Sequence, residues 1–285
     1  MIDKEVLLSM VCFITKHLRL CTLSICLALL VNAFGFHRGV ARELPVGDVS
    51  SLRERIEFSV KWSFVTLLKT CMETHGLGNG KDPIFYRLTH QAASNIFWND
   101  RMASIIDSES LLPYRMETVI KEGKEVFVES IVFERDLGKA LFSHQEPQTG
   151  RSIVDRLEIT DMSMDPLSAF YYLRKRLSPG NPSLELEGIT GSRRFVLRGR
   201  LAAEESIDVP AGNFEVYRVE CSFEYWPQGD RARPTRIKSK GKKNCSFTLW
   251  VSQDNHRLPV QIRYHLPLGS LWVKAISLTC YEPVS

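Results

Sequence analysis

Residues 217–225 read Tyr-Arg-Val-Glu-Cys-Ser-Phe-Glu-Tyr, a strict alternation of apolar and polar side chains. Successive side chains of a β-strand point to opposite faces of a sheet, so this stretch would bury one face and leave the other in water. Sheets with one buried and one solvated face are antiparallel, because parallel sheets are covered on both faces. The stretch therefore predicts a strand of an antiparallel sheet.

The same alternation recurs on both sides of this stretch. Upstream it governs residues 56–62, 86–92 and 114–120, and downstream it governs residues 245–251 and 260–266. No part of the chain has the spacing that is typical of βαβ units. We therefore expect a mainly β protein with about ten to twelve short strands.

Turn-forming residues separate the expected strands. Gly78-Asn79-Gly80 and Glu122-Gly123-Lys124 fall between alternating segments, and Pro210-Ala211-Gly212-Asn213 precedes residues 217–225. Such short connections join neighbouring antiparallel strands as hairpins. A sheet of this length has to curl in order to bury one face. The predicted fold is an antiparallel meander that is curled into a barrel or half-barrel.

One amphipathic helix is expected where the alternation gives way to helical spacing. Asp165 suits the N-cap position and Pro166 the first helical position. Leu167, Phe170 and Tyr171 then recur at intervals of three and four residues and would share one face of a helix. We expect this helix to cover or plug the apolar face of the curled sheet.

The N-terminal residues carry the features of an export signal. Lys16 and Arg19 precede an apolar run over residues 20–36 that contains no charge. A basic segment followed by such a run is typical of a secretory signal peptide. We interpret residues 1–41 as a signal peptide and residues 42–285 as one β domain in the periplasm or cell envelope. The alternative is an inner-membrane anchor formed by residues 20–36, which are just long enough to span a bilayer.

Positive charge is concentrated in one segment of the chain. The protein has 37 Lys and Arg against 33 Asp and Glu, a net charge of +4 that does not resemble a nucleic-acid binder. The segment lies between two expected strands and is either a solvated hairpin tip or a contact surface for an anionic membrane or envelope polysaccharide. Because the protein carries an export signal, we expect no nucleic-acid partner. The charged residues of this segment are Arg231, Arg233, Arg236, Lys238, Lys240, Lys242 and Lys243.

Four of the seven cysteines lie outside the expected signal peptide: Cys71, Cys221, Cys245 and Cys280. Cys221 and Cys245 flank the basic segment and fall on the apolar phase of their strands. If the strands place these two residues opposite each other, an oxidising compartment would allow a disulfide between them. Otherwise each cysteine behaves as a small buried hydrophobe. No spacing of Cys and His suits zinc, and we expect no metal site.

Several segments resemble the DUF3108 family of exported bacterial proteins of unknown function. Among them are Met-Asp-Pro-Leu-Ser-Ala-Phe-Tyr-Tyr-Leu-Arg at residues 164–174 and Val-Pro-Ala-Gly-Asn-Phe at residues 209–214. The resemblance extends through residues 107–113, 249–252, 257–260 and 266–270, in the order that the family shows. It implies a predominantly antiparallel β fold in the bacterial envelope. It implies no catalytic residues, since none is established for the family.

Catalytic motifs are absent from the sequence. There is no G-x-S-x-G, no H-E-x-x-H and no Walker loop, so we expect neither an enzyme nor a bound cofactor. Acidic residues such as Glu117, Glu129 and Glu220 alternate with apolar neighbours and are expected to point outward into solvent.

Side chains on the apolar phase are the main candidates for a functional site. They form either a filled core or the lining of a cavity for a lipid or another apolar ligand. His90 shares this phase and is either a hydrogen-bonded core histidine or a polar anchor for a ligand. The candidate lining residues are Phe58, Trp62, Tyr86, His90, Tyr225, Phe247 and Tyr264.

Three functions remain open from the sequence. The first is non-enzymatic binding or chaperoning of an apolar, lipid-like ligand inside the curled sheet. The second is an interaction or scaffold module of the envelope that acts through residues 231–243. The third is an envelope hydrolase, which would require His90 to lie beside a carboxylate and a nucleophile in one pocket.

Overall fold

The computed structural model of the chain describes residues 50–281, apart from residues 64, 79–83, 94–98, 123–124, 228–242 and 267–268. Fourteen strands form one antiparallel sheet in this part of the chain. Their bounds are β1 (Ser50–Trp62), β2 (Val65–Leu77), β3 (Phe85–Ala93), β4 (Asn99–Asp107), β5 (Pro113–Glu122), β6 (Glu125–Glu134), β7 (Lys139–Glu146), β8 (Arg151–Glu158), β9 (Ser183–Thr190), β10 (Arg193–Val209), β11 (Gly212–Pro227), β12 (Lys243–Ser252), β13 (Pro259–Leu266) and β14 (Gly269–Cys280).

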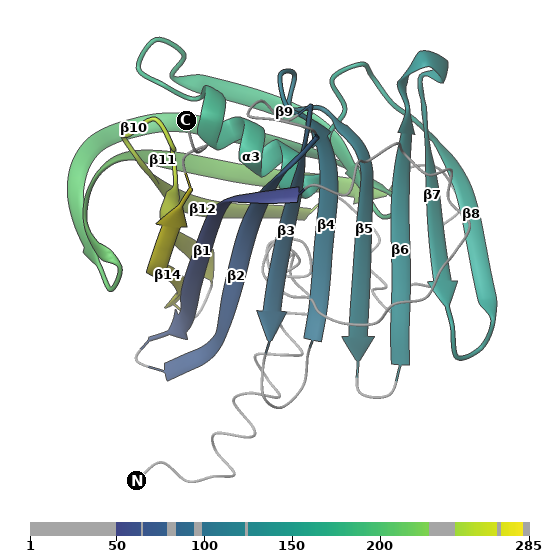
Figure 1. The fold of residues 1–285 in the computed structure, drawn as a ribbon, viewed down its shortest axis with the longest axis horizontal. Helices are drawn as coiled ribbons and strands as arrows, with labels where there is room; N and C mark the ends of the chain where they lie inside the picture. The colour runs from purple at the N-terminus through teal and green to yellow at the C-terminus, as the bar shows by residue number, and fades with distance from the viewer. Residues whose placement is uncertain are drawn as a thin grey trace, which may run out of the picture.

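The order of the strands shows a meander that is folded back on its own start. The sheet runs β8-β7-β6-β5-β4-β3-β2-β1-β14-β13-β12-β11-β10-β9, so the first and last strands pair in the middle of the sheet. Figure 1 shows β1 to β8 as one wall, with β10 to β12 crossing behind it. The strands β8 and β9 form the two edges, and the sheet is not closed. The predicted fold class, a mainly β antiparallel meander curled into a half-barrel with one helix, is confirmed.

The stretch 217–225 lies in β11, between β10 and β12. Its apolar residues Val219, Cys221, Phe223 and Tyr225 are all buried. They face the interior between the wall of β1 to β8 and the opposite wall that contains β10 to β12. We call the side of the sheet that faces this interior the inner face. The alternation at these positions therefore sets which face of the sheet carries the core.

The predicted helix is α3 (Pro166–Arg176), and a short 3-10 helix, η1 (Arg135–Leu137), precedes β7. The Asp165 carboxylate caps α3 by accepting hydrogen bonds from the backbone N–H groups of Leu167 and Ser168, at 2.8 and 3.0 Å. It also accepts a 2.6 Å hydrogen bond from the Ser104 hydroxyl of β4, which ties the start of the helix to the sheet.

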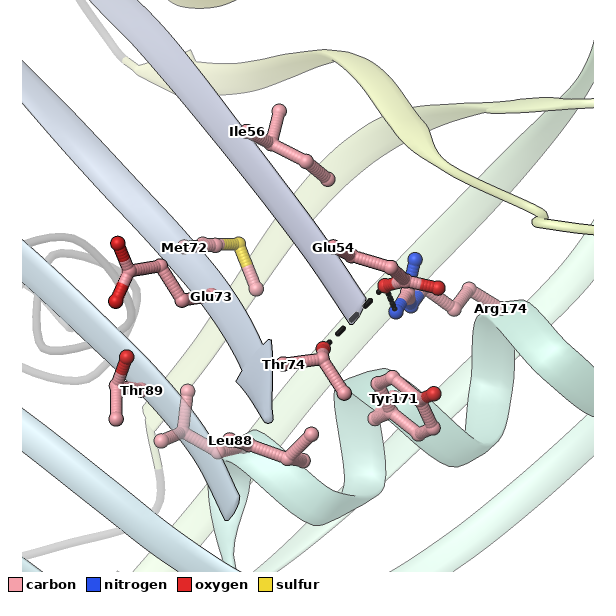
Figure 2. Close-up of a pocket in the computed structure, with 10 residues that line it drawn as sticks. Glu54, Ile56, Met72, Glu73, Thr74, Leu88, Thr89, Tyr171 and Arg174 are labelled. Atoms are coloured by element: carbon pink, nitrogen blue, oxygen red, sulfur yellow. Dashed lines mark hydrogen bonds and ion pairs between the residues drawn. The ribbon is translucent and has the colours of Figure 1, made fainter. Parts of the chain in front are cut away.

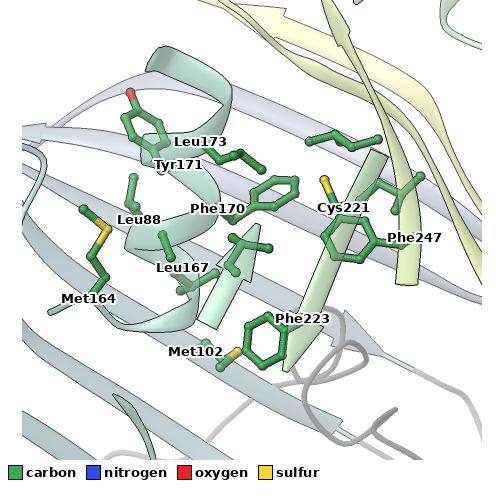
Figure 3. Close-up of a cluster of buried hydrophobic side chains, with 14 of the residues drawn as sticks. Leu88, Met102, Met164, Leu167, Phe170, Tyr171, Leu173, Cys221, Phe223 and Phe247 are labelled. Atoms are coloured by element: carbon green, nitrogen blue, oxygen red, sulfur yellow. The ribbon is translucent and has the colours of Figure 1, made fainter. Parts of the chain in front are cut away.

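The helix fills the space between the two walls. Figure 3 shows Leu167 and Phe170 of α3 in one cluster with Met102 of β4 and with Phe223 and Phe247 of the opposite wall. Gly199 lets α3 lie close to β10, because a Cβ atom at this position would lie 2.5 Å from a methyl carbon of Leu173. The helix is thus part of the core as well as a cover for it.

The two edges of the sheet approach each other at Met164, which follows β8. Met164 donates a 3.0 Å backbone hydrogen bond to Glu187 of β9 and accepts one of 2.8 Å from Ile189. The pairing places Met164 beside Gly188, where a Cβ atom would lie 2.1 Å from the Met164 carbonyl oxygen. A side chain at residue 188 would therefore prevent this parallel bridge.

The N-terminal predictions fall outside the described residues. The signal peptide over residues 1–41 and the alternative anchor over residues 20–36 both lie in this part of the chain. Within the described residues, no helix combines the length and apolar character needed to cross a membrane.

Candidate functional site

A single row of side chains crosses the inner face of the wall from β1 to β8. Strand pairing places each member directly beside the next, and directly opposite residues have Cβ atoms about 4.5–5.5 Å apart. We call this set the inner row. In strand order it consists of Ile56, Met72, His90, Met102, Thr118, Glu129, His144 and Ile153.

Burial changes along the inner row. The residues His90 and Met102 are 0% and 1% exposed. The side chains of Glu129 and His144 are 22% and 14% exposed. The same change occurs along β6, where Ile131 is buried and Phe127 is only partly buried. The inner face is therefore covered around β3 and β4 and partly uncovered where β6, β7 and β8 lie away from α3.

The partly uncovered region combines apolar and charged side chains, and we call it the open end. Two of its apolar members adjoin each other, because Ile120 pairs with Phe127, whereas Ile153 pairs with His144. The Phe127 and His144 rings stack at a centroid distance of 5.8 Å. The open end consists of Ile120, Phe127, Glu129, His144, Glu146 and Ile153, all of them partly buried.

His144 lies between two carboxylates. Its Nδ1 atom donates a 3.0 Å hydrogen bond to Glu129, and its Nε2 atom lies 3.6 Å from Glu146. Arg151 lies 3.7 Å from the same Glu146 carboxylate. The hydrogen bond to Glu129 and the negative charges raise the pKa of His144 above its usual value, although burial opposes the shift. The open end thus favours a protonated imidazole.

His90 has the opposite environment. The Thr70 hydroxyl donates a 2.8 Å hydrogen bond to the carbonyl of Gln91, so its oxygen has to accept the hydrogen bond from Nε2 of His90. The proton of the neutral ring is therefore on Nε2, and Nδ1 carries a lone pair. Complete burial lowers the pKa of His90 to about 3. Nδ1 has no hydrogen-bond partner among the described residues.

A buried ion pair joins α3 to β1. The Arg174 guanidinium contacts the Glu54 carboxylate, and the two side chains are 2% and 8% exposed. Lys175 lies 3.3 Å from Glu54, and the Thr74 hydroxyl donates to Glu54 at 3.3 Å. Burial opposes ionisation of Glu54, but the two cations outweigh it and lower its pKa. The pair fixes the end of α3 against the sheet.

The pocket beside this ion pair is small. Figure 2 shows Tyr171 and Arg174 of α3 facing Met72 and Thr74 of β2 across it. Its volume is about 10 Å³, enough for about one water molecule. A second pocket, of about 70 Å³, lies where the sheet edges meet and includes Gly188 in its lining. Neither pocket is large enough for a lipid chain.

The candidate lining residues lie around the filled part of the interior. Phe58, Tyr225, Phe247 and Tyr264 are 1–2% exposed, and His90 is fully buried. Trp62 and Tyr86 are partly buried at the margin of the same cluster, and the Tyr86 ring lies 6.1 Å from that of Tyr171. Their role in ligand binding stays a prediction.

The predicted disulfide is wrong. Pairing of β11 with β12 sets Cys221 opposite Phe247, and Cys245 opposite Phe223, two residues away from the register that a disulfide needs. Cys221 is a free, buried thiol, so the predicted Cys221–Cys245 disulfide does not form.

The orientation predicted for Glu129 is also wrong. Glu129 was expected to point outward, but it lies on the inner face between Thr118 and His144.

The basic segment falls outside the described residues. Of the candidate contact residues, Arg231, Arg233, Arg236, Lys238, Lys240 and Lys242 all lie in residues 228–242, and Lys243 is described only as the first backbone position of β12. Among the described residues, no group of three or more His, Cys, Asp and Glu side chains is arranged to hold a metal ion.

The sequence matches the model of one protein family. The model of the family described as "Protein of unknown function (DUF3108)" matches residues 57–276. The chain belongs to this family. No curated protein matches the chain.

Several solved structures are similar to the chain, among them the following three. One is a beta-barrel-like protein of the domain of unknown function DUF1849 from Brucella abortus, at 10% identity and a TM-score of 0.53, covering 81% of this chain and 98% of that one. The others are a candidate lipoprotein from Parabacteroides distasonis, at 9% identity, 80% and 96% coverage and a TM-score of 0.35, and a candidate exported protein with a YmcC-like fold from Bacteroides fragilis, at 10% identity, 80% and 96% coverage and a TM-score of 0.34. The likeness to the Brucella protein shows a shared beta-barrel-like fold.

Proposed function

We propose that the protein is a non-catalytic binding protein of the bacterial envelope that holds an apolar, lipid-like ligand at the open end of its half-barrel. The observation that carries the proposal is the change in burial along the inner face. Met116 and Ile131 near α3 are buried, whereas Ile120 and Phe127 of the same two strands are partly exposed. Apolar surface on the inner face is thus left for a ligand to cover.

The open end offers both parts of an amphiphile-binding site. Ile120 and Phe127 provide adjoining apolar surface for an acyl chain, and Ile153 adds apolar surface beside His144. Glu129 and His144 provide polar groups that fix the orientation of a head group, as is usual in sites for small molecules. The apolar residues buried around α3 belong to the core in this proposal and support the site without touching the ligand.

The envelope location rests on the export features of residues 1–41. A basic segment followed by an uncharged apolar run directs secretion. An exported protein that binds a lipid-like ligand would meet that ligand at the membrane surface. Fractionation of a bacterial host that produces the full chain tests the location, and recovery in the cytoplasm would contradict it.

Two neighbouring residues of β8 provide a matched test of ligand binding. Ile153 faces the open end, whereas Val154 points away from it and is 57% exposed. Native mass spectrometry and solvent extraction should show a lipid-like molecule on the protein isolated from the envelope. Ile153→Glu should remove that molecule and Val154→Glu should leave it bound. Wild-type protein that is repeatedly isolated empty, or equal binding by both variants, would contradict the proposal.

A further inference from the structure

We propose that the buried end of the inner row is a binding site for Cu(I), with Nδ1 of His90 and the thioether sulfurs of Met72 and Met102 as ligands. The three residues come from neighbouring strands and share the inner face. The site is separate from the open end, so it does not depend on the proposed ligand-binding function.

Strand pairing brings the three side chains together. Met72 of β2 and Met102 of β4 are each directly opposite His90 of β3. Directly opposite residues have Cβ atoms about 4.5–5.5 Å apart, a span that a methionine side chain with three rotatable bonds readily crosses. The sheet therefore places one methionine on each side of His90.

The hydrogen bonds of His90 leave the correct nitrogen for a metal. Thr70 uses its only proton on Gln91 and so fixes the His90 proton on Nε2. Nδ1 keeps its lone pair, and it lacks a hydrogen-bond partner in the described part of the chain although the residue is completely buried. A buried polar atom without a hydrogen bond destabilises the fold, so such an atom is unusual unless a ligand satisfies it.

The donor set selects the metal. Thioether sulfur is a soft ligand that prefers Cu(I), whereas Zn²⁺ is held in proteins by thiolate, imidazole and carboxylate groups. A neutral imidazole and two neutral thioethers add no negative charge to a buried site. A monovalent ion loses less hydration free energy on burial there than a divalent ion does.

The site has a route to solvent. Met72 is partly buried, and its side chain forms part of the wall of the small pocket beside α3 (Figure 2). Rotation of the Met72 side chain would open the way from this pocket to His90. Met102 is 1% exposed and closes the far side of the site.

Substitution of methionine by leucine tests the site with little change in packing, because the two side chains have similar volumes. The full mature chain is titrated anaerobically with Cu(I) in competition with a chromophoric Cu(I) chelator, after its accessible thiols have been alkylated. One Cu(I) should bind per chain. Met72→Leu or Met102→Leu should weaken it by at least about 10- to 100-fold, the loss that even indirect partners of a metal produce.

Met164→Leu is the matched control, because Met164 is as buried as Met102 but lies beside Gly188, where the sheet edges meet. It should leave the affinity for Cu(I) unchanged, and Zn²⁺ should not compete. Binding of Cu(I) should also shift the Nδ1 resonance of His90 and give X-ray absorption with both sulfur and nitrogen ligands. Affinity that is unchanged in Met72→Leu and Met102→Leu, or a Nδ1 resonance that does not move, would overturn the proposal.

Discussion

The inner face of this sheet is fully covered around α3 and only partly covered at the open end. Around α3 the interior is filled, and Leu167, Phe170 and Phe223 are 1–3% exposed. At the open end, Phe127 and Ile153 lie on the same face of the same sheet and remain partly exposed. Curvature alone therefore does not fill the half-barrel, and the helix decides which part becomes core.

The lengths of the elements explain the difference. The helix α3 has 11 residues and is about 16 Å long. The strand β6 has 10 residues and is about 33 Å long. One short helix cannot cover strands of that length across a wall of eight strands, so part of the inner face is left to other partners.

The largest expected difference in stability is between the buried ion pair at α3 and the exposed ion pair at the open end. Arg174→Met would leave Glu54 buried with only Lys175 nearby, and removing one partner of a buried pair costs about 3–5 kcal/mol. Arg151→Met removes a pair with Glu146 in which the arginine is 47% exposed, and should cost less than about 1 kcal/mol. Urea unfolding measures both free energies.

A double substitution shows whether the buried charge is the cause. Adding Glu54→Gln to Arg174→Met removes the uncompensated carboxylate and should restore part of the lost free energy of unfolding. If Arg174→Met and Arg151→Met lowered the free energy of unfolding by the same amount, the buried pair at α3 would not differ from the exposed pair at the open end.

The bridge at Met164 should depend on Gly188. In Gly188→Ala the new methyl group would lie 2.1 Å from a backbone oxygen that cannot move without breaking the bridge. We expect the free energy of unfolding to fall by about 3 kcal/mol. Gly180→Ala is the control, since a Cβ atom there meets nothing within 4 Å. Thermal unfolding that is the same in both variants would show that the edges do not need this contact.

The two histidines of the inner row should respond to pH with opposite signs. The pKa of His90 falls from 6.5 to about 3 on folding, so its contribution to stability is present above pH 6.5 and lost as the pH falls. Between pH 6.5 and 5, in the presence of a Cu(I) chelator, the wild type should lose about 2 kcal/mol relative to His90→Leu. A constant difference between the two proteins over this range would contradict complete burial of His90.

The effect of His144 should be smaller and reversed. Its pKa is raised on folding, so its contribution is present below about pH 6.5 and is lost as the pH rises through the raised value. His144→Gln should therefore be more destabilising at pH 5.5 than at pH 8.5, by less than about 1 kcal/mol because the pair is partly exposed. An NMR titration midpoint for His144 below 6.5 would remove the role of Glu129.

Much of the fold follows from short-range patterns. Alternation over residues 217–225 places β11 and its buried face, and Asp165-Pro166 marks the start of α3. These features depend on neighbouring residues alone. The open end shares this origin in part, since Glu129 has the same phase as Ile131 and Phe133 and could have been assigned to the inner face from the sequence.

The register between paired strands could not be predicted from such short-range patterns. A shift of two residues keeps Cys221 and Cys245 on the same face but changes which residue lies opposite each cysteine. The inner row depends on seven successive registers, so Met72 and His90 are not recognisable as neighbours from their positions in the chain. The bridge between Met164 and Gly188 likewise depends on how far the whole sheet curls.

A photoactivatable fatty acid locates the ligand most directly. The full mature chain is irradiated with a diazirine-labelled fatty acid, and the cross-linked peptides are identified by mass spectrometry. Labels should fall on β6 and β8, at or beside Phe127 and Ile153, and an excess of unlabelled fatty acid should suppress them. Labels concentrated on α3, or labels that unlabelled fatty acid does not suppress, would contradict this account, in which the interior around α3 is filled and the ligand binds at the open end.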